Sequence, residues 1–107
     1  IEVIDAVHAD ELITDEAAEE SIEVIKKSRS GKMVEVNLDD ICANFEDGDV
    51  VTLEALKAKR LVNKAAGRLK VLANGTMTKA LTVEADKFSL QAVKMITLAG
   101  GVAKKYV

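Results

Sequence analysis

The sequence predicts an α/β fold with a small mixed sheet and packed helices. Apolar and polar residues alternate at 33–38 and at 68–73, as they do in half-buried strands. After Ser89, apolar residues recur at the three- and four-residue spacing of a helix. A chain of 107 residues suits one domain with one core. Because 49% of the residues are hydrophobic and only 3% aromatic, that core must be aliphatic.

The first 31 residues are expected to form an acidic helical extension. Thr14 can cap a helix over residues 14–29, with acidic residues in its first turn and basic residues in its last. Its narrow apolar face is formed by Ala18, Ile22 and Ile25. A short strand ahead of this helix would be formed by Ile1, Val3 and Val7.

The middle of the chain predicts a strand, a connection and a short helix. The strand at 33–38 directs Val34, Val36 and Leu38 to one side. Residues 39–49 are acidic and end in the turn signal Asp47-Gly48-Asp49. Thr52 can then cap a helix that runs to about Val62.

The second half predicts a hairpin, a helix and a closing strand. Asn74-Gly75 is typical of a tight hairpin turn, and it separates the strand at 68–73 from an expected partner at 77–85. Ser89 caps the last helix and Gly100-Gly101 ends it. Residues 102–107 then complete the order helix, strand, helix, hairpin, helix, strand, which favours α/β packing.

Charge is divided unequally between the two halves. Residues 1–56 hold 16 Asp and Glu against 4 Lys and Arg, a net −12, whereas residues 57–107 hold 2 against 11, a net +9. One interpretation is an acidic extension attached to a surface that binds polyanions. The alternative is that the two halves pair with each other in the fold.

Six short motifs occur in a fixed order from Val36 onward. They read VNLD at 36–39, FEDG at 45–48, VTLEAL at 51–56, LKVLANG at 69–75, KALTV at 79–83 and DKFS at 86–89. This series resembles the C-terminal globular domain of bacterial large-subunit ribosomal protein fifteen, in the L-fifteen/L-eighteen-e superfamily. The resemblance covers about residues 34–107.

The resemblance implies an α/β globular domain at residues 32–107 that docks on large-subunit ribosomal RNA, with residues 1–31 as an additional segment. It implies RNA contacts at the hairpin around Lys70 and Asn74-Gly75, at the Lys87-Phe88-Ser89 turn and at the Gly100-Gly101 corner.

Three features depart from the family pattern. The extension is acidic rather than basic and glycine-rich, Ala73 replaces a glycine, and Asp86 replaces a basic residue. The chain is therefore either a working ribosomal protein of this family or a divergent paralogue or fused domain.

RNA binding needs cations placed over phosphates, because each neutralised phosphate releases counterions. The candidate RNA-binding residues are Lys57, Lys59, Arg60, Lys64, Arg68, Lys70, Asn74, Gly75, Lys79, Lys87, Ser89, Lys94, Lys104 and Lys105. The alternative is that these lysines and arginines are an ordinary solvated surface. The only aromatic residues are Phe45, Phe88 and Tyr106, so recognition would be of shape and backbone rather than by base stacking. Phe88 is expected to lie in the core.

The acidic helix has two interpretations. In the first it simply covers one face of the sheet. In the second its carboxylates fold over the basic half, mimic phosphate and weaken RNA binding. A different function altogether would be a protein-interaction module, in which this helix binds another protein or forms a homodimer.

The sequence predicts neither an enzyme nor a metal or cofactor site. His8 is the only histidine and lies in an expected tail, and Cys42 sits among acidic residues that oppose a thiolate, as expected of a buried, inert thiol. No zinc, calcium or phosphate-loop pattern is present.

The absence of a disulfide pair, a membrane span and a signal peptide predicts a cytoplasmic protein, and the start at Ile1 indicates a fragment. The expected partners are ribosomal RNA, with other ribosomal proteins as further candidates.

Overall fold

The computed structural model describes residues 4–5, 9, 11–25, 27 and 29–106. Its strands form two parallel sheets and one small antiparallel pair. The three-stranded sheet contains β3 (Lys32–Asn37), β5 (Ala66–Leu72) and β8 (Lys87–Phe88). The four-stranded sheet contains β2 (Glu23–Ile25), β9 (Val102–Tyr106), β7 (Thr82–Ala85) and β4 (Val50–Val51). The antiparallel pair is β1 (Ile4–Asp5) with β6 (Thr76–Met77).

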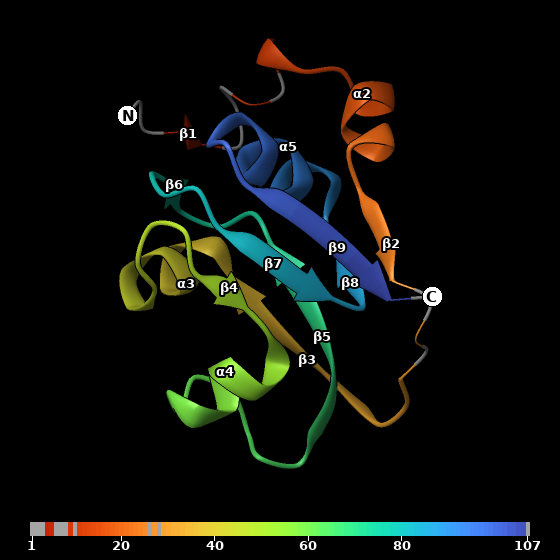
Figure 1. The fold of residues 1–107 in the computed structure, drawn as a ribbon, viewed down its shortest axis with the longest axis vertical. Helices are drawn as coiled ribbons and strands as arrows, with labels where there is room; N and C mark the ends of the chain where they lie inside the picture. Colours follow the sequence, from red (N-terminus) through yellow and green to blue (C-terminus); the bar gives the residue numbers. More distant parts are fainter. Residues whose placement is uncertain (1–3, 6–8, 10, 26, 28, 107) are drawn as a thin grey trace.

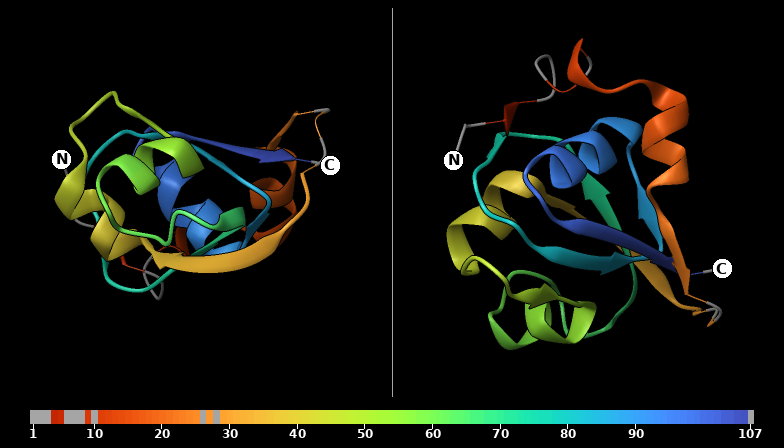
Figure 2. Two further views of the ribbon diagram at one scale, coloured as in Figure 1. Left: turned by 90° about the horizontal axis from the view of Figure 1, so that it is seen from below. Right: turned by 45° about the horizontal axis from the view of Figure 1, so that its top comes forward.

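From β3 onward the chain passes back and forth between the two parallel sheets. It visits β3, β4, β5, β7, β8 and β9 in turn, apart from the short β6, and each sheet therefore receives its strands in chain order. The helices on this path are α3 (Leu38–Asn44), α4 (Leu53–Ala58) and α5 (Leu90–Leu98). Figure 2 (left) shows β3 along one side of the molecule and β9 along the other, with α5 between them. The predicted α/β class is confirmed, although its strands divide between two sheets.

The core is aliphatic, as the composition predicts. Its largest fully buried side chains are Leu38, Ile41, Leu56, Leu69, Met77, Leu81, Met95, Ile96, Val51, Val71, Val83 and Val93. Five consecutive residues of α5, from 92 to 96, are buried. Because five consecutive helical residues point in all directions around the axis, α5 must be covered on more than its core side.

The cover on α5 comes from the N-terminal part of the chain. Figure 1 shows α2 (Asp15–Glu20) lying beside α5, and β2 extending the four-stranded sheet beyond β9. Ala18 of α2 is fully buried, and the Ser21 and Thr97 hydroxyls are 3.1 Å apart across the contact. We call residues 14–29 the arm.

The helix predicted at 14–29 is wrong in its second half. Thr14 caps α2 as expected, since its Oγ1 accepts a hydrogen bond from Ala17 N at 3.2 Å. The helix ends at Glu20, however, and Glu23–Ile25 pairs in parallel with β9. The free edge of β9 offers backbone partners to a segment rich in β-branched residues, and this tertiary pairing overrides the helical spacing.

The predicted hairpin around Asn74-Gly75 is also wrong. β5 is the central strand of its sheet, with β3 on one edge and β8 on the other, so it has no edge left for an antiparallel partner. The chain does turn at Gly75, whose φ is +90°, but it then forms β6 and crosses to β7 in the other sheet. A Cβ at Gly75 would also fall 2.2 Å from the Cβ of Asp39.

Several local signals are confirmed and two elements were missed. The caps at Thr52 and Ser89 accept hydrogen bonds from Ala55 N and Ala92 N, although α4 ends at Ala58 rather than near Val62. Helix α3 and the two-residue strand β4 were not predicted in the acidic stretch. The strand expected from Ile1, Val3 and Val7 falls on residues outside those that the structure describes.

Candidate nucleic-acid interface

Three cations lie side by side on the outer face of the three-stranded sheet. On β5, Leu69 and Val71 are fully buried, so Arg68 and Lys70 point to the opposite, outer side. Lys70 is paired in register with Lys87 of β8, which is exposed. We call Arg68, Lys70 and Lys87 the basic sheet face.

The basic sheet face has no ion pair with the described residues. Its nearest acidic neighbour in register is Glu35 of β3, opposite Lys70, and no contact between their charged groups reaches salt-bridge distance. Like charges directly opposite each other on neighbouring strands destabilise a sheet. A polyanion lying across Lys70 and Lys87 would remove that repulsion.

A second group of cations follows α4 along the chain toward β5. Its members are Lys57, Lys59, Arg60 and Lys64. Lys59, Arg60 and Lys64 are exposed, and the Lys59 ammonium lies 4.9 Å from the centre of the Phe45 ring. Since these residues lead directly into β5, the chain itself connects them to the basic sheet face.

Three other predicted positions have structural contacts. Lys79 Nζ donates to the backbone carbonyls of Cys42 and Phe45, at 2.6 Å each. Asn74 Nδ2 donates to Asn37 Oδ1 at 3.1 Å, and the Ser89 hydroxyl caps α5. These groups therefore fix the fold where they stand, and Gly75 provides the turn already described.

The cations near the arm are engaged by its carboxylates. Lys94 Nζ lies 2.5 Å from Asp15 Oδ1, and the Lys94 side chain is only 4% exposed. Lys104 Nζ lies 3.8 Å from Glu23 Oε2. Lys105, also on β9, is half-buried. The predicted cations therefore do not converge on one face, and the two halves of the chain pair in part.

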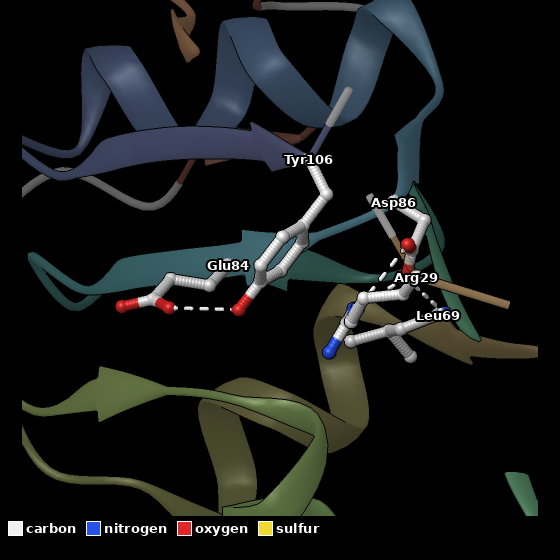
Figure 3. A network of polar contacts seen from close by, with 5 residues as sticks. All are labelled: Arg29, Leu69, Glu84, Asp86 and Tyr106. Carbon is white, nitrogen blue, oxygen red and sulfur yellow. Dashed lines mark hydrogen bonds and ion pairs between the residues drawn. The ribbon is translucent and has the colours of Figure 1, made fainter. Parts of the chain in front are cut away.

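A buried polar network, not foreseen from the sequence, anchors the end of the arm (Figure 3). Arg29 donates to both carboxylate oxygens of Asp86, and Leu69 N donates to Asp86 Oδ2 at 2.8 Å. The Arg29 guanidinium lies 3.8 Å from the centre of the Tyr106 ring. The signal that could have indicated it is Asp86 itself, one of only two acidic residues after position 56.

Tyr106 shares this network with Glu84. Its hydroxyl donates to Glu84 Oε1 at 3.2 Å. Burial raises the pKa of Tyr106 above its ordinary value of 10.0; Arg29 opposes this effect, and the hydrogen bond and negative charge of Glu84 add to it. The network is thus a structural anchor made from the arm, β7 and β9.

The candidates for other chemistry find no support in the described residues. Cys42 is half-buried rather than fully buried, with its Sγ 3.2 Å from Thr78 Oγ1. The described part of the chain gathers no three metal-ligating side chains, and none of its helices has the length and apolar character needed to cross a membrane. His8 lies outside the described residues. Phe88 packs against the core, as expected.

Comparison with known proteins gives a consistent result. Residues 35–104 match the ribosomal protein family that comprises 50S-L15, 50S-L18e and their 60S counterpart. The large ribosomal subunit protein uL15 of Trichlorobacter lovleyi is 53% identical over 57 residues, which cover 53% of this chain and 38% of that protein. The uL15 protein of Mesomycoplasma hyopneumoniae is 45% identical over 65 residues, or 61% of this chain and 44% of the relative.

A plant relative extends the comparison. The large ribosomal subunit protein uL15c of Pisum sativum is 46% identical over 74 residues, covering 64% of this chain and 29% of that protein. The chain thus spans less than half the length of these curated relatives. The matched region begins within β3 and leaves the arm outside it.

Proposed function

This chain belongs to the family of large-subunit ribosomal proteins that includes 50S-L15 and 50S-L18e, and from that premise we propose that it binds ribosomal RNA through the basic sheet face. The role is structural: the domain holds RNA by its phosphate backbone and catalyses no reaction. The observation that carries the proposal is the row of Arg68, Lys70 and Lys87 on one outer sheet face, without ion-pair partners among the described residues.

The second group, Lys57, Lys59, Arg60 and Lys64, extends the proposed interface along the chain. Lys94 is left out of it, because its ammonium is buried and bonded to Asp15. Lys79 and Ser89 are left out because their polar groups are used within the fold. Recognition by backbone and shape fits this composition, since Phe88 packs inward and offers no stacking platform.

The test is binding to large-subunit ribosomal RNA, and co-sedimentation with large subunits, in graded salt. Each phosphate contact contributes roughly 0.7–0.9 to the slope of log affinity against log salt. Replacing Lys70 and Lys87 by Gln should therefore lower the magnitude of this slope by roughly 1.5 and weaken binding at low salt.

The matched control replaces Lys27 and Lys105 by Gln, which removes the same charge from the arm and from the other sheet. This control should retain the slope of the parent chain. Equal losses in both variants would show that only net charge matters and would overturn the proposed face. Binding that does not change with salt would instead support an apolar protein interface.

A further inference from the structure

The arm and the surface beneath it have opposite charges. Asp15 and Glu23 of the arm lie over Lys94 of α5 and Lys104 of β9. The two carboxylates are largely exposed, at 68% and 60%, whereas the lysines below them are 4% and 35% exposed. Each carboxylate therefore occupies the solvent side of its lysine, which is where a phosphate group would bind.

The arm is held unequally along its length. At one end the Arg29–Asp86 pair is buried, with side chains 13% and 7% exposed, and Arg29 also lies over the Tyr106 ring. Elsewhere the arm is held by a three-residue strand pairing, by the packing of α2 on α5 and by ion pairs whose carboxylates face water. Exposed ion pairs are weak and are screened by salt, whereas breaking a buried pair leaves an uncompensated charge.

We propose that α5 and β9 carry a second surface for RNA phosphates, formed by Lys94 and Lys104, and that the acidic arm covers it as a phosphate mimic. The arm lifts about Arg29, which stays bonded to Asp86, and RNA phosphates then replace Asp15 and Glu23. This inference rests on the proposed RNA-binding function and adds to it a competition between the arm and RNA.

The direct test weakens the mimic without touching the cations. Asp15→Asn with Glu23→Gln should raise affinity for large-subunit ribosomal RNA severalfold at low salt. It should also increase the magnitude of the salt slope by roughly 1.5, because two further lysines reach phosphate. Adding Lys94→Gln and Lys104→Gln to this variant should cancel both gains.

The matched control is Glu19→Gln with Glu20→Gln, which makes the same change in net charge on the same helix. Both residues are exposed and have no ion pair with the described residues. Equal gains in the two variants would reduce the effect to net charge and overturn the mimicry. Unchanged affinity in the Asp15 and Glu23 variant would overturn it as well.

Two further variants separate the possible failures. Asp15→Glu keeps the charge and should bind RNA like the parent chain, so a gain from it would indicate a disturbed fold rather than released cations. If the parent chain binds RNA and loses binding with Lys70→Gln and Lys87→Gln, but the arm variant gains nothing, only the second surface fails. If the parent chain binds no RNA, the proposed function itself fails.

Discussion

At the residue scale, the Asp86 carboxylate is the most heavily bonded charged group described. It accepts hydrogen bonds from Arg29 and from Leu69 N, and little of either charged side chain is exposed. A buried charge is tolerated only when it is paired and hydrogen-bonded. Asp86 and Arg29 therefore depend on each other, although 57 positions separate them in the sequence.

Tyr106 offers a measurable consequence of this network, because it is the only tyrosine and the chain has no tryptophan. Its pKa is raised, chiefly by burial, so the phenolate should form only above pH 10. The folded state favours the protonated phenol; this contribution to stability is present below pH 10 and is lost as pH rises through the raised pKa. A near-ultraviolet absorbance titration of the folded chain measures it.

Two variants should move this titration in opposite directions. Glu84→Gln removes a negative charge beside the phenol and should lower the pKa of Tyr106, whereas Arg29→Met removes a positive charge and should raise it. Glu35→Gln, on the other parallel sheet, should leave the titration unchanged. A titration at the ordinary value of 10.0 in the parent chain would contradict the buried network.

The helix caps at Thr14, Thr52 and Ser89 could be predicted from sequence, whereas the Arg29–Asp86 pair could not. A cap depends on a side chain and a backbone amide three positions away, so the sequence contains the whole interaction. The pair depends on which strands become neighbours. The same limit applies to the basic sheet face: its residue types were anticipated, but its register was not.

At the scale of elements, the junction between α5 and β9 leaves no room for a side chain at Gly101. A Cβ there would fall 2.1 Å from the carbonyl oxygen of Leu81, which accepts from Val102 N. Gly101→Ala should therefore lower the free energy of unfolding by about 3 kcal/mol, because backbone atoms must move. Denaturant unfolding measures this change.

Gly48→Ala is the comparison for this prediction. Gly48 has a φ of +88°, but a Cβ at this position would meet nothing within 4 Å. Only the left-handed backbone is then strained, at about 1 kcal/mol. Equal losses from the two substitutions would mean that the close approach of Gly101 to Leu81 contributes little.

The hairpin and the long N-terminal helix failed for a common physical reason. Local spacing and turn residues report what a segment can form by itself. The outcome was decided by which strand edges were available: both edges of β5 are occupied, and the edge of β9 is open to β2. Elements whose partners lie far along the chain are the ones that local patterns miss.

At the scale of the whole molecule, the division of charge serves two arrangements at once. The acidic half pairs with the basic half through Asp15–Lys94 and Glu23–Lys104, and Arg29 pairs in the opposite sense with Asp86. The basic sheet face stays outside this pairing. The sequence offered a polyanion surface and mutual pairing as alternatives, and the structure supports the second for the residues near the arm.

Amide hydrogen exchange should rank the parts of the molecule by how they are held. The backbone of β5 and β7 has partner strands on both sides, whereas β2 lies at the outer edge of its sheet. Residues 23–25 should therefore exchange fastest among the strands of the two parallel sheets. Arg29→Met should accelerate them further while β5 and β7 remain protected. Equal protection of β2 and β7 would contradict an arm that lifts separately.

The pairing of β2 with β9 joins the earliest and latest strands of the two parallel sheets. A chain emerging from its own ribosome can add each later strand beside one already made, but β2 must wait for residues 102–106. During synthesis, nascent α5 thus has a period in which Asp15 is not yet fixed over Lys94. Newly made molecules would meet RNA before they could shield themselves from it, and maturation would end with the shield closing.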